Sequence, residues 1–88
     1  MKTFIVYTRD DCGWCVLAKT LLNKQGIVFT ELNVGKDVSR DVFLEFVDDH
    51  SMKPTVPKIV VDGRLIGGYE DLVEYFENEA GGYGEGGL

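Results

Sequence analysis

The two cysteines of the chain, Cys12 and Cys15, both lie in the segment YTRDDCGWCVLAKTLL, residues 7–22. The residues from Gly13 onward have the apolar spacing of a helix, so the pair stands at a predicted helix start. There the helix dipole and the unpaired amides of the first turn favour a negative charge, and the thiolate is the nucleophilic form of cysteine. We expect Cys12 to be exposed and to attack disulfides, and Cys15, one turn further in, to resolve the mixed disulfide.

Two other uses of a cysteine pair fit this sequence less well. A disulfide between such close neighbours closes a short loop and removes little entropy from the unfolded chain. A structural zinc site usually needs four ligands, and the single His50 would bring the total only to three. His50 could instead form a catalytic pair with a cysteine. Its place at the end of a predicted helix favours a capping or surface role, because a cation is stabilised there.

Charged residues on both sides of the pair act on Cys12 in opposite directions. Arg9 and Lys19 should stabilise a Cys12 thiolate, whereas Asp10 and Asp11 should oppose it by like charge. In water such charges interact by only about 1 kcal/mol at contact distance, so their orientation decides the balance.

The bulk composition indicates one small soluble domain. At 88 residues the chain can build one modest core. Its net charge of −6, from 9 basic and 15 acidic residues, disfavours nucleic-acid binding, which needs clustered Lys and Arg. No apolar run approaches the ~18 residues that span a bilayer, and the first residues lack the pattern of a signal peptide. We therefore expect a cytoplasmic monomer that does not bind membranes.

The apolar pattern predicts elements in the order β-α-β-α-β-β-α. The predicted strands cover residues 2–8, 27–34, 57–61 and 64–67, and the predicted helices cover residues 13–25, 37–50 and 69–79. Asp62–Gly63 is a strong hairpin-turn signal between the last two strands. A parallel βαβ half, a crossover helix and a hairpin give an α/β fold, with a four-stranded mixed sheet and helices on both faces.

Two further boundaries follow from local sequence. Asp37 is the expected N-cap of the second helix. The apolar stripe expected on that helix consists of Val38, Val42, Phe46 and Val47. The segment GGYGEGGL at the C-terminus has five glycines in eight residues. We therefore expect a domain over residues 1–80 and a flexible tail over residues 81–88.

Three segments together resemble the signature segments of the glutaredoxin family. They are CGWC with Arg9 three residues earlier, TVPKIVVDG (residues 55–63) and IGGYEDL (residues 66–72). They occur in the family's order and spacing, and the resemblance extends from residue 2 to about residue 79. The short, acidic chain is also similar to small bacteriophage glutaredoxins, sometimes called thioredoxins, which would place it in the host cytoplasm.

The resemblance implies a thioredoxin fold and a glutathione site. Pro57 would be the family's cis-proline, and the Val56 backbone would pair with the cysteinyl part of glutathione. The helix that begins after Gly68 would bind the γ-glutamyl carboxylate with its amides. Asp71 would meet the γ-glutamyl ammonium, or serve only as a first-turn acid. The residues implied in glutathione binding are Arg9, for the glycine carboxylate, Trp14, Thr55, Val56, Pro57, Gly68, Tyr69, Glu70 and Asp71.

The resemblance implies a dithiol glutaredoxin that reduces protein disulfides and glutathione mixed disulfides. Glutathione would be the electron donor, glutathione reductase its indirect partner, and ribonucleotide reductase a client. Where the family commonly has Pro-Tyr, this chain has Gly13-Trp14, and we expect Trp14 to be an exposed aromatic wall that docks a partner. Relatives with a small residue there include some that share a [2Fe–2S] cluster through the first cysteine, here Cys12. Two alternatives therefore stay open: a glutathione-dependent cluster carrier, and a thioredoxin-like protein reduced by thioredoxin reductase. No other metal is expected.

Overall fold

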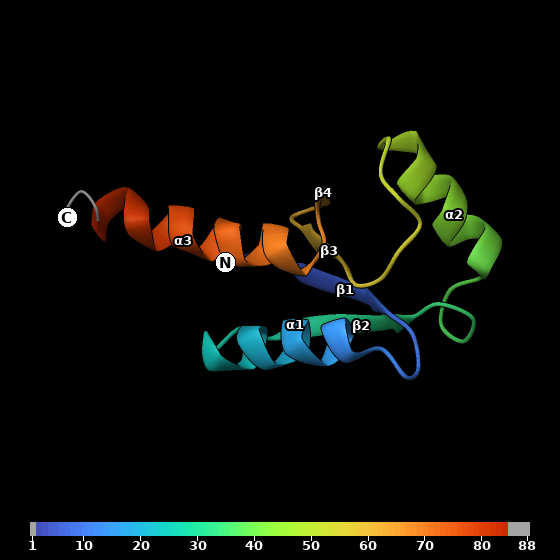
Figure 1. Ribbon diagram of the computed structural model, residues 1–88, viewed down its shortest axis with the longest axis horizontal. Coiled ribbons are helices and arrows are strands. Elements are labelled where there is room, and N and C mark those ends of the chain that lie inside the picture. The colour runs from blue at the N-terminus through green and yellow to red at the C-terminus, as the bar shows by residue number, and fades with distance from the viewer. Residues whose placement is uncertain (1, 85–88) are drawn as a thin grey trace.

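The structure, a computed structural model, describes residues 2–84 and has the predicted order of elements around one four-stranded sheet (Figure 1). The strands are β1 (Phe4–Thr8), β2 (Phe29–Asn33), β3 (Lys58–Val61) and β4 (Arg64–Gly67). The helices are α1 (Gly13–Lys24), α2 (Arg40–Asp49) and α3 (Tyr69–Gly84). The predicted α/β architecture is confirmed.

The sheet is mixed and has the strand order β2-β1-β3-β4. β1 runs parallel to β2 and antiparallel to β3. Parallel strands need a crossover connection, which α1 supplies between β1 and β2. The β3–β4 hairpin turns at Asp62 and Gly63, whose φ angles of 51° and 80° are the left-handed values that a two-residue turn of type I′ requires. The hairpin expected from this dipeptide is thus confirmed.

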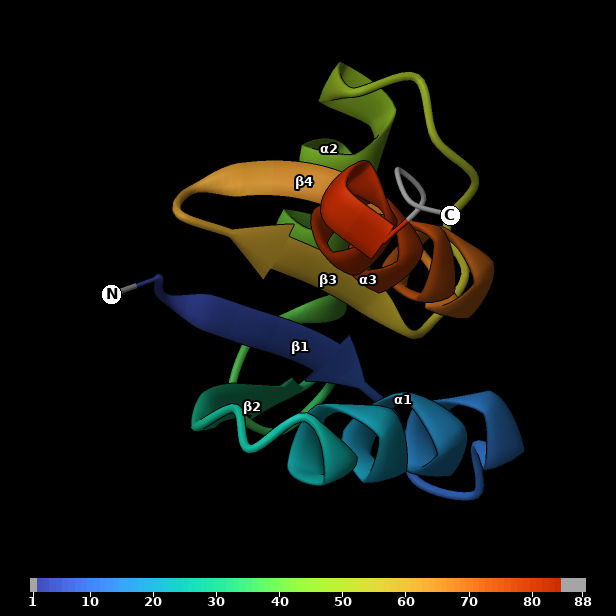
Figure 2. The same ribbon diagram turned by 90° about the vertical axis from the view of Figure 1, so that its left-hand side faces the viewer.

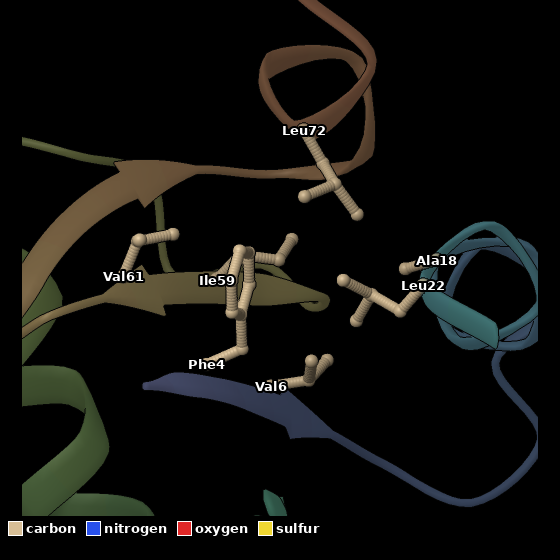
Figure 3. Close-up of a cluster of buried hydrophobic side chains, with 7 residues drawn as sticks. All are labelled: Phe4, Val6, Ala18, Leu22, Ile59, Val61 and Leu72. Carbon is tan, nitrogen blue, oxygen red and sulfur yellow. The ribbon is translucent and has the colours of Figure 1, made fainter. Parts of the chain in front are cut away.

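Helices cover both faces of the sheet, α1 and α3 on one and α2 on the other (Figure 2). The larger apolar cluster lies beneath α1 and α3 (Figure 3), and its buried members are Phe4, Val6, Ala18, Leu22, Ile59, Val61 and Leu72. The smaller cluster lies beneath α2, with Val34, Phe43 and Val47 buried. Because α1 packs on the sheet through Ala18 and Leu22, its first turn is held beyond the carboxyl end of β1. That turn carries both cysteines.

The second helix begins later than the sequence predicts. The expectation that Asp37 caps it is wrong. Ser39 is the N-cap, and its Oγ accepts a hydrogen bond from the Val42 amide at 3.1 Å. The carboxylate of Asp37 instead accepts from the amide of Asn33, within the preceding turn. With the helix starting at Arg40, its buried residues are Phe43 and Val47. Val42 is exposed and does not belong to the buried stripe.

The C-terminal ends of α2 and α3 can also be compared with the ends predicted from the sequence. His50 is the C-cap of α2, and its Nδ1 lies 2.9 Å from the Phe46 carbonyl oxygen, which confirms the capping role. α3 continues to Gly84, beyond the predicted end at residue 79, and residues 85–88 of the predicted tail lie outside the described residues. The flexibility of that tail stays a prediction. None of the helices within residues 2–84 is long and apolar enough to traverse a bilayer.

The cap of α2 can be tested by removing one hydroxyl. Ser39→Ala is expected to lower the free energy of unfolding by about 1 kcal/mol, because an amide of the first turn loses its acceptor. Thr20→Ala is the matched control, since it removes a hydroxyl from an exposed position inside α1. Urea unfolding should show a loss for Ser39→Ala and no loss for Thr20→Ala. An unchanged stability of Ser39→Ala would contradict the assignment of the cap.

Candidate active site

The two cysteines form a disulfide at the start of α1. Cys12 is the N-cap of the helix, and its Sγ accepts a hydrogen bond from the Cys15 amide at 3.1 Å. Cys12 is half-buried, whereas Cys15 is only 2% exposed. Cys12 is thus less exposed than expected but more exposed than Cys15, and the attacking and resolving roles stay predictions. A thiolate at Cys12 would keep the amide donor and the field of the helix N-terminus.

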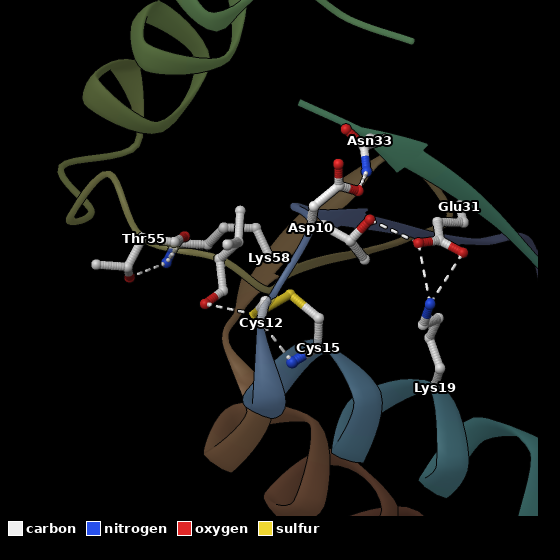
Figure 4. Close-up of a disulfide and its surroundings, with 10 residues drawn as sticks. Asp10, Cys12, Cys15, Lys19, Glu31, Asn33, Thr55 and Lys58 are labelled. Carbon is white, nitrogen blue, oxygen red and sulfur yellow. Dashed lines mark hydrogen bonds and ion pairs between the residues drawn. A yellow bond between two sulfur atoms is a disulfide. The ribbon is translucent and has the colours of Figure 1, made fainter. Parts of the chain in front are cut away.

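The segment before β3 lies directly against Cys12. The Val56–Pro57 peptide bond is cis, as the resemblance implies. The Cys12 sulfur lies 3.9 Å from the Val56 carbonyl oxygen, a contact drawn in Figure 4. These residues meet because β3 runs antiparallel to β1, so that the start of β3 lies beside the end of β1. The fold therefore brings Val56 and Pro57 to the cysteine pair from more than forty residues away in sequence.

Lys58 anchors this segment through hydrogen bonds to Thr55. The sequence did not predict a role for this residue. Its side chain is 5% exposed, and its Nζ donates to the carbonyl oxygen and to Oγ1 of Thr55 at 2.8 and 2.9 Å. Burial lowers the pKa of Lys58, and the charge of Asp71 opposes that change. A lysine at the first position of a strand usually indicates exposure, so the sequence held no signal for this buried ammonium. Two hydrogen bonds from one fixed cation restrain the conformation of the Thr55–Pro57 segment.

The start of α3 closes the other side of the site. Asp71 accepts a hydrogen bond from the amide of Gly68 at 2.8 Å, so its carboxylate caps its own helix. Of the two roles considered for Asp71, the structure shows the first-turn acid, and contact with a ligand ammonium stays a prediction. Gly67 has a φ of 129°, and a Cβ there would overlap the Asp71 carboxylate. A Cβ at Gly68 would lie 3.4 Å from the Pro57 carbonyl oxygen, an ordinary contact, so the close approach that requires a glycine is at Gly67.

A groove of about 560 Å³ runs between these segments. Trp14 forms one wall, is 57% exposed as expected, and packs against Tyr69 with ring centroids 5.7 Å apart. The lining residues that the sequence singled out are Trp14, Thr55, Val56, Pro57, Gly68, Tyr69, Glu70 and Asp71. Gly67, within the IGGYEDL segment, also lines the groove, and the lining residues that the sequence did not single out are Met52, Lys53 and Lys58.

Arg9 lies elsewhere, on a second hollow of about 460 Å³. Its lining residues are Arg9, Asp10, Asp11, Cys12, Gly13, Cys15, Val16, Lys19, Glu31 and Asn33. The hollow that Arg9 lines is thus not the one formed by the other predicted glutathione residues. Contact between Arg9 and a glycine carboxylate remains a prediction.

The charges next to the cysteines are engaged in local contacts. Asp10 pairs with Lys36 at 3.0 Å and accepts from Asn33 at 3.1 Å, and the Lys36 hydrogen bond is the main cause of its lowered pKa. Lys19, expected to act on Cys12, forms an ion pair with Glu31 at 3.1 Å. The side chains of Asp10 and Lys19, whose orientation the sequence left open, are therefore both directed toward partners of opposite or complementary character. Within residues 2–84, no group of three or more His, Cys, Asp or Glu side chains is arranged to hold a metal ion.

The close approach at Gly67 gives a test of the groove. Gly67→Ala is expected to lower the free energy of unfolding by about 1–3 kcal/mol, because the residue has a left-handed φ and no room for a Cβ. Gly13→Ala is the control, since a Cβ there would meet nothing within 4 Å. Its stability should not fall, because Gly→Ala at a position with compatible backbone angles usually gains about 0.4–1 kcal/mol. Urea unfolding of the oxidised proteins measures both, and equal losses would contradict the overlap with Asp71.

Known proteins that this chain resembles belong to one family. A profile of the glutaredoxin family matches residues 4–66. Glutaredoxin 3 of Escherichia coli K12 is 37% identical over 73 residues, which cover 82% of this chain and 83% of that protein. Glutaredoxin 1 of Rickettsia prowazekii is 33% identical over 72 residues, which cover 82% of this chain and 75% of that protein.

A solved structure supports the same conclusion. Glutaredoxin 1 of Francisella tularensis, crystallised with cacodylate, superposes with a TM-score of 0.70 at 26% identity. The superposition covers 91% of this chain and 98% of that one. The mixed sheet, the cis-proline segment and the cysteine pair at the start of α1 are therefore those of a thioredoxin-like fold, and the chain belongs to the glutaredoxin family.

Proposed function

We propose that this thiol–disulfide oxidoreductase is a dithiol glutaredoxin that uses glutathione as its electron donor. Exchange between thiols and disulfides follows from the family and from the Cys12–Cys15 pair. The observation that carries the proposal of glutathione is the groove next to Cys12, which is lined by the cis-proline segment and by the N-terminus of α3. The substrates would be protein disulfides and glutathione mixed disulfides.

The dithiol reaction transfers one electron pair to a client disulfide. The Cys12 thiolate attacks one client sulfur, and the other client sulfur leaves with the electron pair and takes up a proton. Cys15 then loses its proton and attacks the Cys12 sulfur. This step forms the Cys12–Cys15 disulfide and releases the second client sulfur as a thiol. Two glutathione molecules restore the dithiol by the same exchange and leave as glutathione disulfide.

The backbone of the groove suits a short peptide thiol. The cis-proline segment presents Val56 next to the Cys12 sulfur, where the cysteinyl unit of a bound tripeptide must lie to exchange. At the other side, the first-turn amides of α3 lack acceptors within their helix, apart from the contact between Gly68 and Asp71. Such amides bind carboxylates. A γ-glutamyl carboxylate bound there would leave the thiol near Cys12.

The charged lining of the groove also suits glutathione, which carries two carboxylates and one ammonium. Lys53 and Lys58 belong to the side of the cis-proline segment, and Glu70 and Asp71 belong to the side of α3. The groove therefore presents both signs of charge within an otherwise acidic protein. Electrostatic complementarity of this kind favours the correct orientation of a zwitterionic ligand.

The wider context of the reaction rests on the resemblance to small bacteriophage glutaredoxins. Ribonucleotide reductase would be one client, because it needs repeated reduction of a disulfide. Glutathione reductase would be the indirect partner that recycles glutathione disulfide. Both would require a cytoplasmic location, which we also propose.

The proposal is tested by following NADPH oxidation with a glutathione mixed disulfide, glutathione and glutathione reductase. Turnover that saturates with the mixed disulfide would support the glutathione site. No turnover by a folded protein whose two thiols titrate as free would contradict it. The same protein would then be supplied with thioredoxin reductase in place of glutathione. Turnover under that condition would identify the thioredoxin-like alternative.

Substitutions of the two cysteines are expected to have different effects on thiol transfer. Cys12→Ser should lose all thiol transfer, because the attacking sulfur is gone. Cys15→Ser should stop the reduction of protein disulfides but keep the exchange of glutathione mixed disulfides, which needs only Cys12. The measurement compares insulin reduction with mixed-disulfide turnover for each variant. Loss of both activities in a folded Cys15→Ser protein would contradict a monothiol route.

A further inference from the structure

Both cysteines line the second hollow, together with Lys19 and Glu31, and neither lines the peptide groove. Cys12 also contacts Val56, which lines the groove, so Cys15 is the farther of the two from the substrate side. Its sulfur is almost fully shielded, since the residue is 2% exposed.

Lys19 and Glu31 are fixed there by a third residue, Thr8 (Figure 4 shows the pair). Thr8 is 1% exposed, and its Oγ1 donates to Oε2 of Glu31 at 2.6 Å. The Lys19 ammonium contacts both carboxylate oxygens of Glu31 at 3.1 and 3.2 Å. The Thr8 hydrogen bond, and then Lys19, keep the pKa of Glu31 below its usual value, so both charges are present at neutral pH. One ion pair is thus anchored through a buried hydroxyl.

The sequence position of Lys19 places it over Cys15. Residues four apart on a helix lie on the same face, one turn above the other, and Cys15 and Lys19 are so spaced on α1. Glu31 reaches the same place from the middle of β2. The two members of the pair therefore come from different elements, and their charges act on Cys15 with opposite sign.

The other charged residues that line this hollow are Arg9, Asp10 and Asp11, in the loop that precedes Cys12. Asp10 is paired with Lys36, and Arg9 and Asp11 have opposite signs. On the groove side of the disulfide, the charged residues are Lys53, Lys58, Glu70 and Asp71, and the Lys58 Nζ is directed to Thr55. Changing Lys19 or Glu31 alone therefore changes the net charge on the Cys15 side of the disulfide by one unit.

We propose that Lys19 and Glu31 are positioning residues that set the acidity of the resolving thiol, Cys15, from the hollow opposite the substrate groove. The attack of Cys15 on the mixed disulfide requires its proton to leave, and the reverse step requires the Cys15 sulfur to depart as a thiolate and regain a proton. A cation beside the sulfur favours the thiolate, and an anion opposes it. The ion pair holds these two influences near balance. This role depends on the thiol–disulfide exchange of the pair and not on glutathione as the donor.

The test isolates the step in which Cys15 reacts. Reduced protein is mixed rapidly with the chromogenic disulfide of thionitrobenzoate. The first release of coloured thiolate reports attack by Cys12, and the second reports resolution by Cys15. Cys15→Ser should abolish the second release, which fixes the assignment of the phases. The pH dependence of both phases is then measured for Lys19→Met, Glu31→Gln and the double variant, each checked for folding by its thermal transition.

The two single variants are expected to move the second phase in opposite directions. Lys19→Met should slow it at neutral pH and raise its pH midpoint, whereas Glu31→Gln should speed it and lower the midpoint. Each change should be about two- to fivefold, the effect of one unit charge near contact in water. The double variant should return close to the unchanged protein, and high salt should diminish both shifts.

Three results would overturn the proposal. Shifts of the same sign in both single variants would indicate lost packing and not charge. An unchanged second phase in both would show that the pair does not act on Cys15. Equal shifts of the first and second phases would assign the effect to both sulfurs, or to the reagent, and remove the specific role at Cys15.

Discussion

The pairing of β1 on both of its edges is the constraint on which the site depends. Its parallel partner, β2, requires the crossover through α1, and this places the cysteine turn at the carboxyl end of β1. Its antiparallel partner, β3, begins where β1 ends, and this places the cis-proline segment against Cys12. A slip of one residue in β1 would turn Val6 and Thr8 to the opposite face. The core beneath α1 and the anchor of Glu31 would be lost together.

Negative charge is common in this protein, yet little of it bears directly on the reactive sulfur. Asp10 is held by Lys36 and Asn33, Glu31 by Thr8 and Lys19, and Asp71 by the amide of Gly68. These three carboxylates near the site thus each have a donor within the fold. At Cys12 the field of the helix start favours the thiolate. An acidic surface and a reactive thiolate can therefore coexist in one small domain.

Much of this arrangement could be predicted from sequence because its signals are local. The cysteine spacing, the Asp62–Gly63 turn and the apolar runs of the strands each depend on neighbouring residues. The side of the disulfide on which Arg9 lies, the partner of Lys19 and the burial of Lys58 depend on contacts between segments far apart in the chain. The prediction of where α2 begins was wrong for a different reason. Asp37 and Ser39 are both good capping residues, and the Asn33 amide competes for the first of them.

Trp14 has a consequence for how the protein can be observed. It is the only tryptophan of the chain, it lies between the two cysteines, and its indole is more than half exposed beside Tyr69. Disulfides quench the emission of a neighbouring indole more strongly than thiols do. The fluorescence of the unlabelled protein should therefore brighten when the Cys12–Cys15 bond is reduced and dim when it re-forms. The residue that walls the groove would then also serve as an optical reporter of the redox state.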